Sequence, residues 1–284
     1  MKLARFLVDG CPALGVVTDQ GVVPLPAPLS REGDMISLIS QWDDVRAEVA
    51  RLAGVNESSV RVDNAQFLAP IARPGKLLAL GLNYADHVAE NNMATPEHQV
   101  WFCKHQTCIN APFGNVEIPM VSSQIDHEVE LVVVIGRKGR HITRENAPSH
   151  VFGYCVGNDV SVRDWQLQTP QWMLGKSFDS HAPFGPHITT SDEVGDPHRF
   201  GIRCLVNGEL RQSSNTSNLI FTVWDQIAHL SQAMTLEPGD IIFTGTPGGV
   251  GIAMKPPRFL KAGDVVRCEI DELGAIENIF AHES

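Results

Sequence analysis

The stretch DHEVELVVVI, residues 126–135, decides the fold expected for this chain. Side chains of a β-strand alternate between its two faces. Glu128 and Glu130 therefore point the same way, and Val132 and Val134 continue that face. Val129, Leu131, Val133 and Ile135 form the other face. A strand with two apolar faces is typical of a sheet interior, and this one carries two carboxylates at its start.

Those two carboxylates predict a cation. Burying Glu128 and Glu130 side by side is costly unless something positive pairs with them. A divalent metal ion is the simplest cation that would do so. The alternative is a strand end open to water, where both glutamates are solvated and bind nothing.

Length and charge exclude several classes of protein. The 284 residues suffice for one large domain, or for a large and a small one. No apolar run approaches the ~20 residues of a membrane helix, and the opening MKLARFLVDG is too short in its apolar part for a signal peptide. We therefore expect a cytoplasmic protein without a membrane partner. The net charge of -11 argues against general nucleic-acid binding, but not against a small anionic substrate.

The cysteines give no sign of a metal or disulfide framework. None forms a CxxC pair or a zinc pattern. We expect most of them to be small core residues in a reducing compartment. They stand at positions 11, 103, 108, 155, 204 and 268.

Turn-forming residues divide the chain near residue 72. Residues 1–70 alternate short strand candidates with one helix, expected over 35–53. The Pro- and Gly-rich segment 70–76 then predicts a boundary. We expect a small N-terminal α/β domain over 1–72 and a larger, strand-rich domain over 73–284. Its expected strands cover 77–81, 128–136, 152–159, 202–207, 241–244 and 265–271, and its expected helices cover 86–91, 163–168 and 221–234.

The segment GLNYADHVAE, residues 81–90, offers a candidate general base. If residues 86–90 form a helical turn, His87 and Glu90 share a face. A carboxylate beside an imidazole fixes its tautomer and raises its basicity, as in a base that activates water. The alternative is an exposed helix on which the two residues are neighbours by chance.

A second candidate is GYCVGNDVSVRDWQ, residues 153–166. A strand is expected to end near Asp159 and a helix to begin near Arg163. Asp159 then lies at a strand end, where sites are commonly assembled. Asn158 or Ser161, in the alternative, merely caps the helix.

Two further segments carry polar groups beside glycines. In GKSFD, residues 175–179, Lys176 is suited to bind a carboxylate or enolate oxygen, unless it is an ordinary surface lysine. In PGDIIFTGTPGGVG, residues 238–251, a strand runs into a glycine-rich turn. Its amides and the Thr246 hydroxyl are suited to receive an anion. Neither segment has the spacing of a P-loop or a dinucleotide fingerprint.

Taken in this order, the segments resemble the fumarylacetoacetate hydrolase (FAH) superfamily. The likeness covers residues 75–271 and rests on GLNYADHVAE, the Glu-x-Glu strand, GNDVSVRDWQ, GKSFD, VNGELRQ and PGDIIFTGTPGGVG. It is strongest to smaller bacterial-type members, which act on 2-oxo acids as acylpyruvases or 2-hydroxyhepta-2,4-diene-1,7-dioate isomerases. The resemblance implies a mixed α+β fold rich in strands, a roll or sandwich, preceded by the small N-terminal domain. It also implies a homodimer.

The resemblance further implies a role for each candidate residue. In proteins that look like this, a Glu-x-Glu pair and a later aspartate bind Mg²⁺ or Mn²⁺, which carries over to Glu128, Glu130 and Asp159. The family's His–Glu dyad matches His87 and Glu90, and its active-site lysine matches Lys176. Its contacts to the substrate carboxylate match Arg163, Gln166 and Thr246.

One segment departs from the commoner family pattern. Many members have Pro-Ser after the lysine that matches Lys104, whereas here His105, Gln106 and Thr107 follow. This leaves Lys104 and its neighbours as open specificity positions.

The implied reaction is metal-dependent cleavage of the C–C bond of a 2,4-dioxo acid, an acylpyruvate, to pyruvate and a carboxylic acid. His87 would activate the water, and Lys176 would stabilise enolate charge. The same site stabilises any pyruvate enolate, so oxaloacetate decarboxylation and isomerisation of a 2-hydroxy-dienoate are the alternatives. A non-catalytic protein that binds 2-oxo acids is the remaining one. In each case the expected partner is a small anionic 2-oxo acid.

Overall fold

The structure is a computed structural model that describes residues 1–54, 65–86 and 94–283. Its strands are β1 Lys2–Val8, β2 Cys11–Thr18, β3 Gly21–Pro24, β4 Phe67–Leu68, β5 Leu77–Gly81, β6 Val100–Cys103, β7 Ile109–Asn110, β8 Val116–Ile118, β9 Ile125–Asp126, β10 Val129–Ile135, β11 Val151–Asn158, β12 Ser161–Val162, β13 Ala182–Thr190, β14 Gly201–Val206, β15 Glu209–Asn215, β16 Ile241–Phe243, β17 Val265–Ile270 and β18 Gly274–His282. Its α-helices are α1 Ala27–Ser30, α2 Met35–Ser40, α3 Trp42–Ala53, α5 Arg163–Gln166, α6 Met173–Lys176, α7 Ser191–Val194 and α8 Val223–Ala233.

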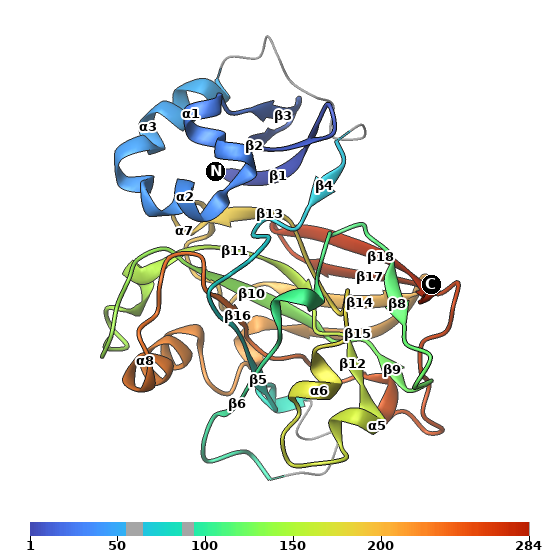
Figure 1. Ribbon diagram of the computed structural model, residues 1–284. Coiled ribbons are helices and arrows are strands. Elements are labelled where there is room, and N and C mark those ends of the chain that lie inside the picture. Colours follow the sequence, from blue (N-terminus) through green and yellow to red (C-terminus); the bar gives the residue numbers. More distant parts are fainter. Residues whose placement is uncertain (55–64, 87–93, 284) are drawn as a thin grey trace.

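Two sheets dominate the described residues. The larger follows the order β3-β2-β1-β13-β11-β10-β16-β5-β6, and the smaller follows β15-β14-β17-β18-β8. Neighbouring strands are mostly antiparallel, with β16 and β5 as a parallel pair in the larger sheet. The strand-rich α+β fold expected from the sequence is confirmed. Figure 1 shows the N-terminal elements and the α5–α6 pair at opposite ends of the molecule.

The alternation predicted for residues 129–135 is present in β10. Val129, Leu131, Val133 and Ile135 pack into one hydrophobic core, while Val132 and Val134 pack into the other. β10 lies between β11 and β16, so it is an interior strand. Both faces are covered, because each packs into a hydrophobic core. A slip by one residue would exchange the side chains that enter the two cores.

The N-terminal segment continues the large sheet through β1, which pairs with β13 at Lys2 and Leu3. The single helix expected over residues 35–53 is wrong: α2 and α3 are separated at Gln41, whose φ of -109° and ψ of 10° leave the helical region. Trp42, the first residue of α3, packs edge-on against Phe152 at 5.1 Å between ring centroids. The tertiary contact thus redirects the chain. The division of the chain at residue 72 stays a prediction.

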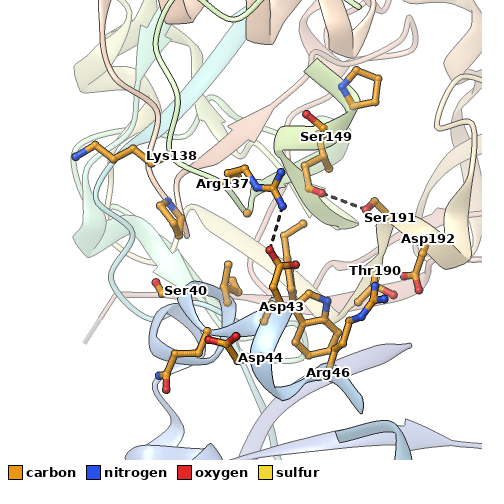
Figure 2. A pocket seen from close by; sticks show the side chains of 18 residues that line it. Ser40, Asp43, Asp44, Arg46, Arg137, Lys138, Ser149, Thr190, Ser191 and Asp192 are labelled. Carbon is orange, nitrogen blue, oxygen red and sulfur yellow. Dashed lines mark hydrogen bonds and ion pairs between the residues drawn. The ribbon is translucent and has the colours of Figure 1, made fainter. Parts of the chain in front are cut away.

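Beside that break, α3 meets the turn after β10. Asp43 forms an ion pair with Arg137 at 3.0 Å across an open cavity of about 560 Å³ (Figure 2). Both side chains are more than half exposed, so the pair adds little to stability.

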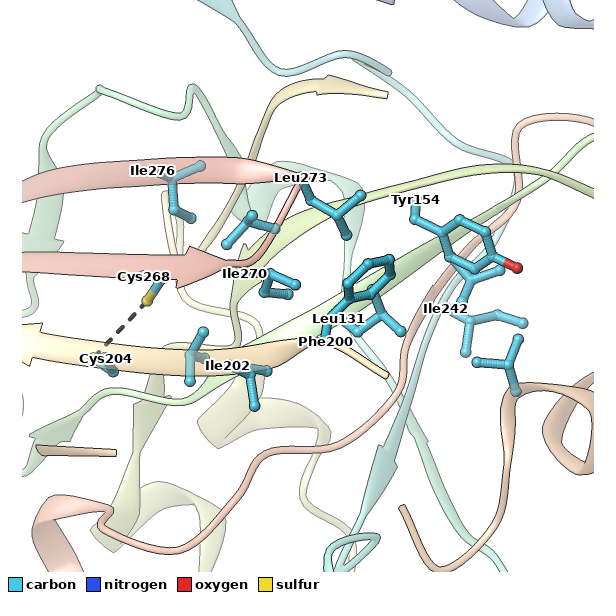
Figure 3. Close-up of a cluster of buried hydrophobic side chains, with 14 of the residues drawn as sticks. Leu131, Tyr154, Phe200, Ile202, Cys204, Ile242, Cys268, Ile270, Leu273 and Ile276 are labelled. Carbon is cyan, nitrogen blue, oxygen red and sulfur yellow. Dashed lines mark hydrogen bonds between the residues drawn. The ribbon is translucent and has the colours of Figure 1, made fainter. Parts of the chain in front are cut away.

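The main core lies between the two sheets. Figure 3 shows Leu131 and Tyr154 of the large sheet facing Ile202 and Ile270 of the small one. Burial of each such aliphatic side chain contributes roughly 1.5–3 kcal/mol relative to exposure. The core therefore provides a rigid platform for the polar ends of β10 and β11.

No described helix is long and apolar enough to cross a bilayer.

Most of the cysteines are core residues, as expected from the sequence. All six are free, and four of them are buried: Cys108, Cys155, Cys204 and Cys268.

Candidate metal centre and active site

Three carboxylates meet where β10 begins and β11 ends. Glu128 and Glu130 come from the start of β10, and Asp159 directly follows β11. The antiparallel register pairs Val129 with Asn158, and the Asp159 amide donates to the Glu128 carbonyl at 2.9 Å. One oxygen from each of the three side chains lies within 4.8 Å of the others, and all three residues are buried.

Two lysines lie among these carboxylates. The ammonium of Lys176, in α6, is 2.7 Å from Oε2 of Glu128 and 2.6 Å from Oδ2 of Asp159. Lys104, after β6, is 2.7 Å from Oδ1 of Asp159. Burial by itself lowers the pKa of Lys176, but Asp159 and Glu128 outweigh it and raise that pKa above its ordinary value. Lys176 is therefore an ammonium at neutral pH and not a base.

α6 reaches the site because Gly175 has no side chain. A Cβ at this position would lie 2.3 Å from the backbone nitrogen of Gln166. α6 packs this closely on α5 only with glycine there. The GKSFD motif thus couples the position of Lys176 to that of α5.

Arg163, the first residue of α5, is held between two acids. Its Nη1 is 2.7 Å from Oε1 of Glu128, and its Nε donates to Oδ2 of Asp126 at 2.8 Å. Asp126 also accepts the amides of Gly251 and Ile252 at 2.7 and 3.0 Å. Burial opposes ionisation of Asp126, yet Arg163 and these amides leave its pKa lower than usual. Asp126 thereby ties α5 to the glycine-rich turn.

The buried charges do not balance. Among the described residues at this site, four carboxylates (Asp126, Glu128, Glu130 and Asp159) face three cations (Lys104, Lys176 and Arg163). The surplus falls on Glu130, whose Oε2 accepts the Gly245 amide at 2.8 Å. Its pKa is raised well above the usual value by burial and by Asp159 and Glu128.

A divalent cation fits this arrangement. Carboxylate oxygens are the hard ligands that Mg²⁺ and Mn²⁺ prefer. Glu128, Glu130 and Asp159 supply three of them at one point, and a cation there would offset the surplus negative charge. The ammonium of Lys176 pairs with both Glu128 and Asp159 and so offsets part of the negative charge of this cluster.

The cluster opens into a small cavity of about 50 Å³. Arg163, Gln166 and Thr246, the predicted substrate contacts, all line it together with Lys176. Arg163 donates to Oε1 of Gln166 at 2.9 Å. Thr246 donates to the Val129 carbonyl at 3.0 Å, which fixes its hydroxyl beside the start of β10. Six of the nine predicted site residues thus line one cavity, and a seventh, Asp159, is buried behind it in contact with Lys176. The roles of all seven stay predictions.

The predicted dyad, His87 and Glu90, lies outside the described residues. The segment leading to it is well anchored. Asn83 is fully buried and donates to the carbonyls of Thr244 and Phe221 at 2.7 and 3.0 Å. This fixes the end of β5 against the turn that follows β16.

Sequence patterns do not assign roles to three residues that build the site. In the sequence, Asp126 is only the first residue of the expected strand, Lys104 is an open specificity position, and Gln212 is the last residue of the VNGELRQ motif. Gln212 accepts the Val129 amide at 3.0 Å and donates to Thr246 at 2.8 Å. Only the motif around Gln212 gave a usable signal, because the other contacts join segments far apart in the chain.

Comparison with known proteins places the chain in a family. A family model described as fumarylacetoacetate (FAA) hydrolase C-terminal matches residues 76–281. The chain belongs to this family.

The chain is similar to curated relatives and to solved structures with named activities. The chain is 50% identical over 225 residues to "Oxaloacetate tautomerase fahd2, mitochondrial" from Xenopus laevis, covering 78% of this chain and 70% of that protein. A human oxaloacetate tautomerase, also mitochondrial, is 48% identical over 82% of this chain and 73% of its own length. The structure of maleylpyruvate hydrolase from Sphingobium sp. SYK-6, in complex with manganese (II) ion and pyruvate, matches with a TM-score of 0.85 and 31% identity over the whole of both chains.

Proposed function

We propose that this enzyme interconverts the enol and keto forms of oxaloacetate or a closely similar 2-oxo diacid, with Mg²⁺ or Mn²⁺ held by Glu128, Glu130 and Asp159. The observation that carries the proposal is that this buried triad lies together with Lys176 and Arg163 at one small cavity, which Glu128 and Glu130 line directly and behind which Asp159 is buried. The identity of about half the aligned residues to oxaloacetate tautomerases supports the choice of reaction.

The cavity favours a small ligand. Its volume of about 50 Å³ is far below the roughly 300–1,000 Å³ of pockets for drug-sized ligands. Its lining combines acids with the cations Lys176 and Arg163. A short acid with an adjacent oxo group matches both the size and the charges.

The chain's own residues divide the work as follows. Arg163 and Gln166, joined by a hydrogen bond, orient a substrate carboxylate. Lys176, held as an ammonium, donates to the oxygen that gains charge as the enolate forms. A metal bound by the triad would supply Lewis acidity toward the 2-oxo group. Tautomerisation breaks one C3–H bond and makes one O–H bond, and we assign the proton transfer to His87, with Glu90 orienting it.

A second candidate is the acylpyruvate hydrolysis implied by the sequence. The specific observation in its favour is the structural match to maleylpyruvate hydrolase with manganese and pyruvate. Hydrolysis uses the same enolate-stabilising groups, but it also needs a water beside the distal carbonyl. Oxaloacetate decarboxylation is a third outcome of the same machinery.

One assay separates the three reactions. Enol oxaloacetate is followed by its ultraviolet absorbance, and products from oxaloacetate and acetylpyruvate are identified, each with Mn²⁺ and with excess EDTA. The proposal predicts metal-dependent loss of the enol signal without release of CO₂. Acetate and pyruvate from acetylpyruvate would favour the hydrolase, and CO₂ from oxaloacetate would favour the decarboxylase.

Assembly and location are also proposals. We expect a homodimer, which sedimentation velocity would test. The cytoplasmic location expected from the sequence stays a prediction, since the vertebrate relatives named above are mitochondrial proteins.

A further inference from the structure

One side of the candidate active site is apolar, and the reaction chemistry does not use it. Leu80, Leu82, Phe102 and Trp172 line the cavity alongside the acids and cations. Phe102 and Trp172 contact each other edge-on, with ring centroids 5.7 Å apart. Lys176 Nζ lies over the Phe102 ring, 5.0 Å from its centroid. This pair of rings therefore stands directly beside the ammonium expected to meet the enolate.

The indole ring of Trp172 packs directly against the backbone of Gly81. A Cβ at Gly81 would lie 2.3 Å from Cζ3 and 3.0 Å from Cη2 of Trp172. Real Cβ atoms essentially never approach so closely, so the indole ring occupies the space that any other residue at position 81 would fill. Gly81 ends β5, which is paired with β6 and so cannot easily retreat.

The indole ring thus has a rigid backing on one side and Phe102 on another. A large, flat side chain held this way reduces the volume of the cavity. Methylene-sized changes in such a wall alter substrate discrimination by about 10–200-fold, so removal of a whole indole ring is a large change.

We infer that Trp172 is a specificity-determining residue that sets the size limit of this site. It would admit 2-oxo acids whose substituent is about as short as that of oxaloacetate and exclude acids with a bulky or aromatic acyl group. The inference rests on the proposed function for the identity of the 2-oxo acid. The size limit itself depends only on the position of Trp172 against Gly81 and Phe102.

The test replaces Trp172 with Ala and compares kcat/KM for enol oxaloacetate, acetylpyruvate and benzoylpyruvate in the Mn²⁺-loaded enzyme. The preference for the small substrate over benzoylpyruvate should fall by about tenfold or more. Trp224→Ala is the matched control, because Trp224 lies on α8 and does not line the cavity. It should leave the preference unchanged.

A double-mutant cycle with Gly81 tests the contact itself. In the wild-type background, Gly81→Ala should displace the indole ring and shift the size preference. In the Trp172→Ala background, the same substitution should have a much smaller effect, because its clash partner is gone and only a methyl group is added to the lining of the cavity. An effect of Gly81→Ala that is as large without Trp172 as with it would overturn the inference, as would an unchanged preference in Trp172→Ala.

Ligand binding separates this inference from the proposed function. Calorimetry measures the affinity of the Mn²⁺-loaded protein for pyruvate, 2-oxobutyrate and phenylpyruvate. Should the wild type turn over none of the substrates, the proposed function fails. The size inference still stands if Trp172→Ala, but not Trp224→Ala, gains affinity for phenylpyruvate relative to pyruvate by about tenfold, and falls if it does not.

Discussion

The ammonium of Lys104 lies 2.7 Å from Oδ1 of Asp159, and both side chains are completely buried. With Lys176 on Oδ2 at 2.6 Å, both carboxylate oxygens of this candidate metal ligand are held by lysines. Lys104, which directly precedes the segment that departs from the commoner family pattern, is therefore a structural part of the acidic cluster.

Replacing Lys104 with Met should destabilise the metal-free protein by about 3 kcal/mol, because the buried Asp159 carboxylate loses one of its two lysine partners and keeps only Lys176. Added Mn²⁺ should restore part of this loss, since the cation offsets the Asp159 charge. Urea unfolding with and without Mn²⁺ measures both effects. Lys104→Arg keeps the charge and should lose less. A gain from Mn²⁺ no larger than in the wild type would argue against a metal at Asp159.

Glu130→Gln should separate metal binding from folding. The substitution removes the surplus negative charge beside Asp159 and Glu128, so the metal-free protein should be as stable as the wild type or more stable. Mn²⁺ affinity should fall by at least about tenfold, because a ligand is lost. Calorimetric titration with Mn²⁺ checks this. Wild-type affinity in the variant would remove Glu130 from the metal site.

Lys176→Met should slow turnover by about 10²–10³-fold, the usual cost of losing one donor to a developing oxyanion. Mn²⁺ binding should survive, because the three carboxylates are intact. Steady-state kinetics and Mn²⁺ titration on the same preparation give both readings. Loss of metal binding together with activity would mean that Lys176 acts by organising the carboxylates.

The free energy of unfolding should decrease in mild acid because His187 is protonated more readily in the unfolded chain than in the native protein. Burial lowers the pKa of this histidine to about 3, against about 6.5 in the unfolded chain. Below pH 6.5 the unfolded state therefore binds a proton that the native state does not. The free energy of unfolding falls by about 2 kcal/mol by pH 5 as a result. His187→Gln should reduce the stability difference between pH 7.5 and pH 5 by about that amount. An unchanged difference in urea unfolding would show that His187 is accessible to protons in the native state.

Local pattern was sufficient for the centre of the fold. The period of two in residues 129–135 predicted which valines share a face, and the local pattern predicted that Asp159 lies at a strand end. That Asp159 joins Glu128 and Glu130 followed from the family resemblance. These features depend on neighbours in the sequence and on one register.

Other strands were hidden by residues that local rules count against them. β13 contains Pro183, Gly185 and Pro186, which normally argue against a strand. In β18, Asn278 is an inward-facing polar residue, and its amide donates to the Gly114 carbonyl at 2.8 Å. In both strands the compensation comes from distant segments.

The same limit applies to the site. Lys104 and Asp159 are 55 residues apart, and Asp126 and Arg163 are 37 apart. No period or motif signals such a pair, because only the folded sheet brings the two partners together. The Trp172–Gly81 contact is of the same kind.

Anomalous diffraction from crystals grown with Mn²⁺ and pyruvate would test the central claim most directly. The account predicts one strong peak among the carboxylates of Glu128, Glu130 and Asp159, at about 2.0–2.6 Å from their oxygens, with pyruvate against Arg163 and Lys176. A catalytically active crystal with no peak among these three side chains, or with its manganese bound elsewhere, would contradict it.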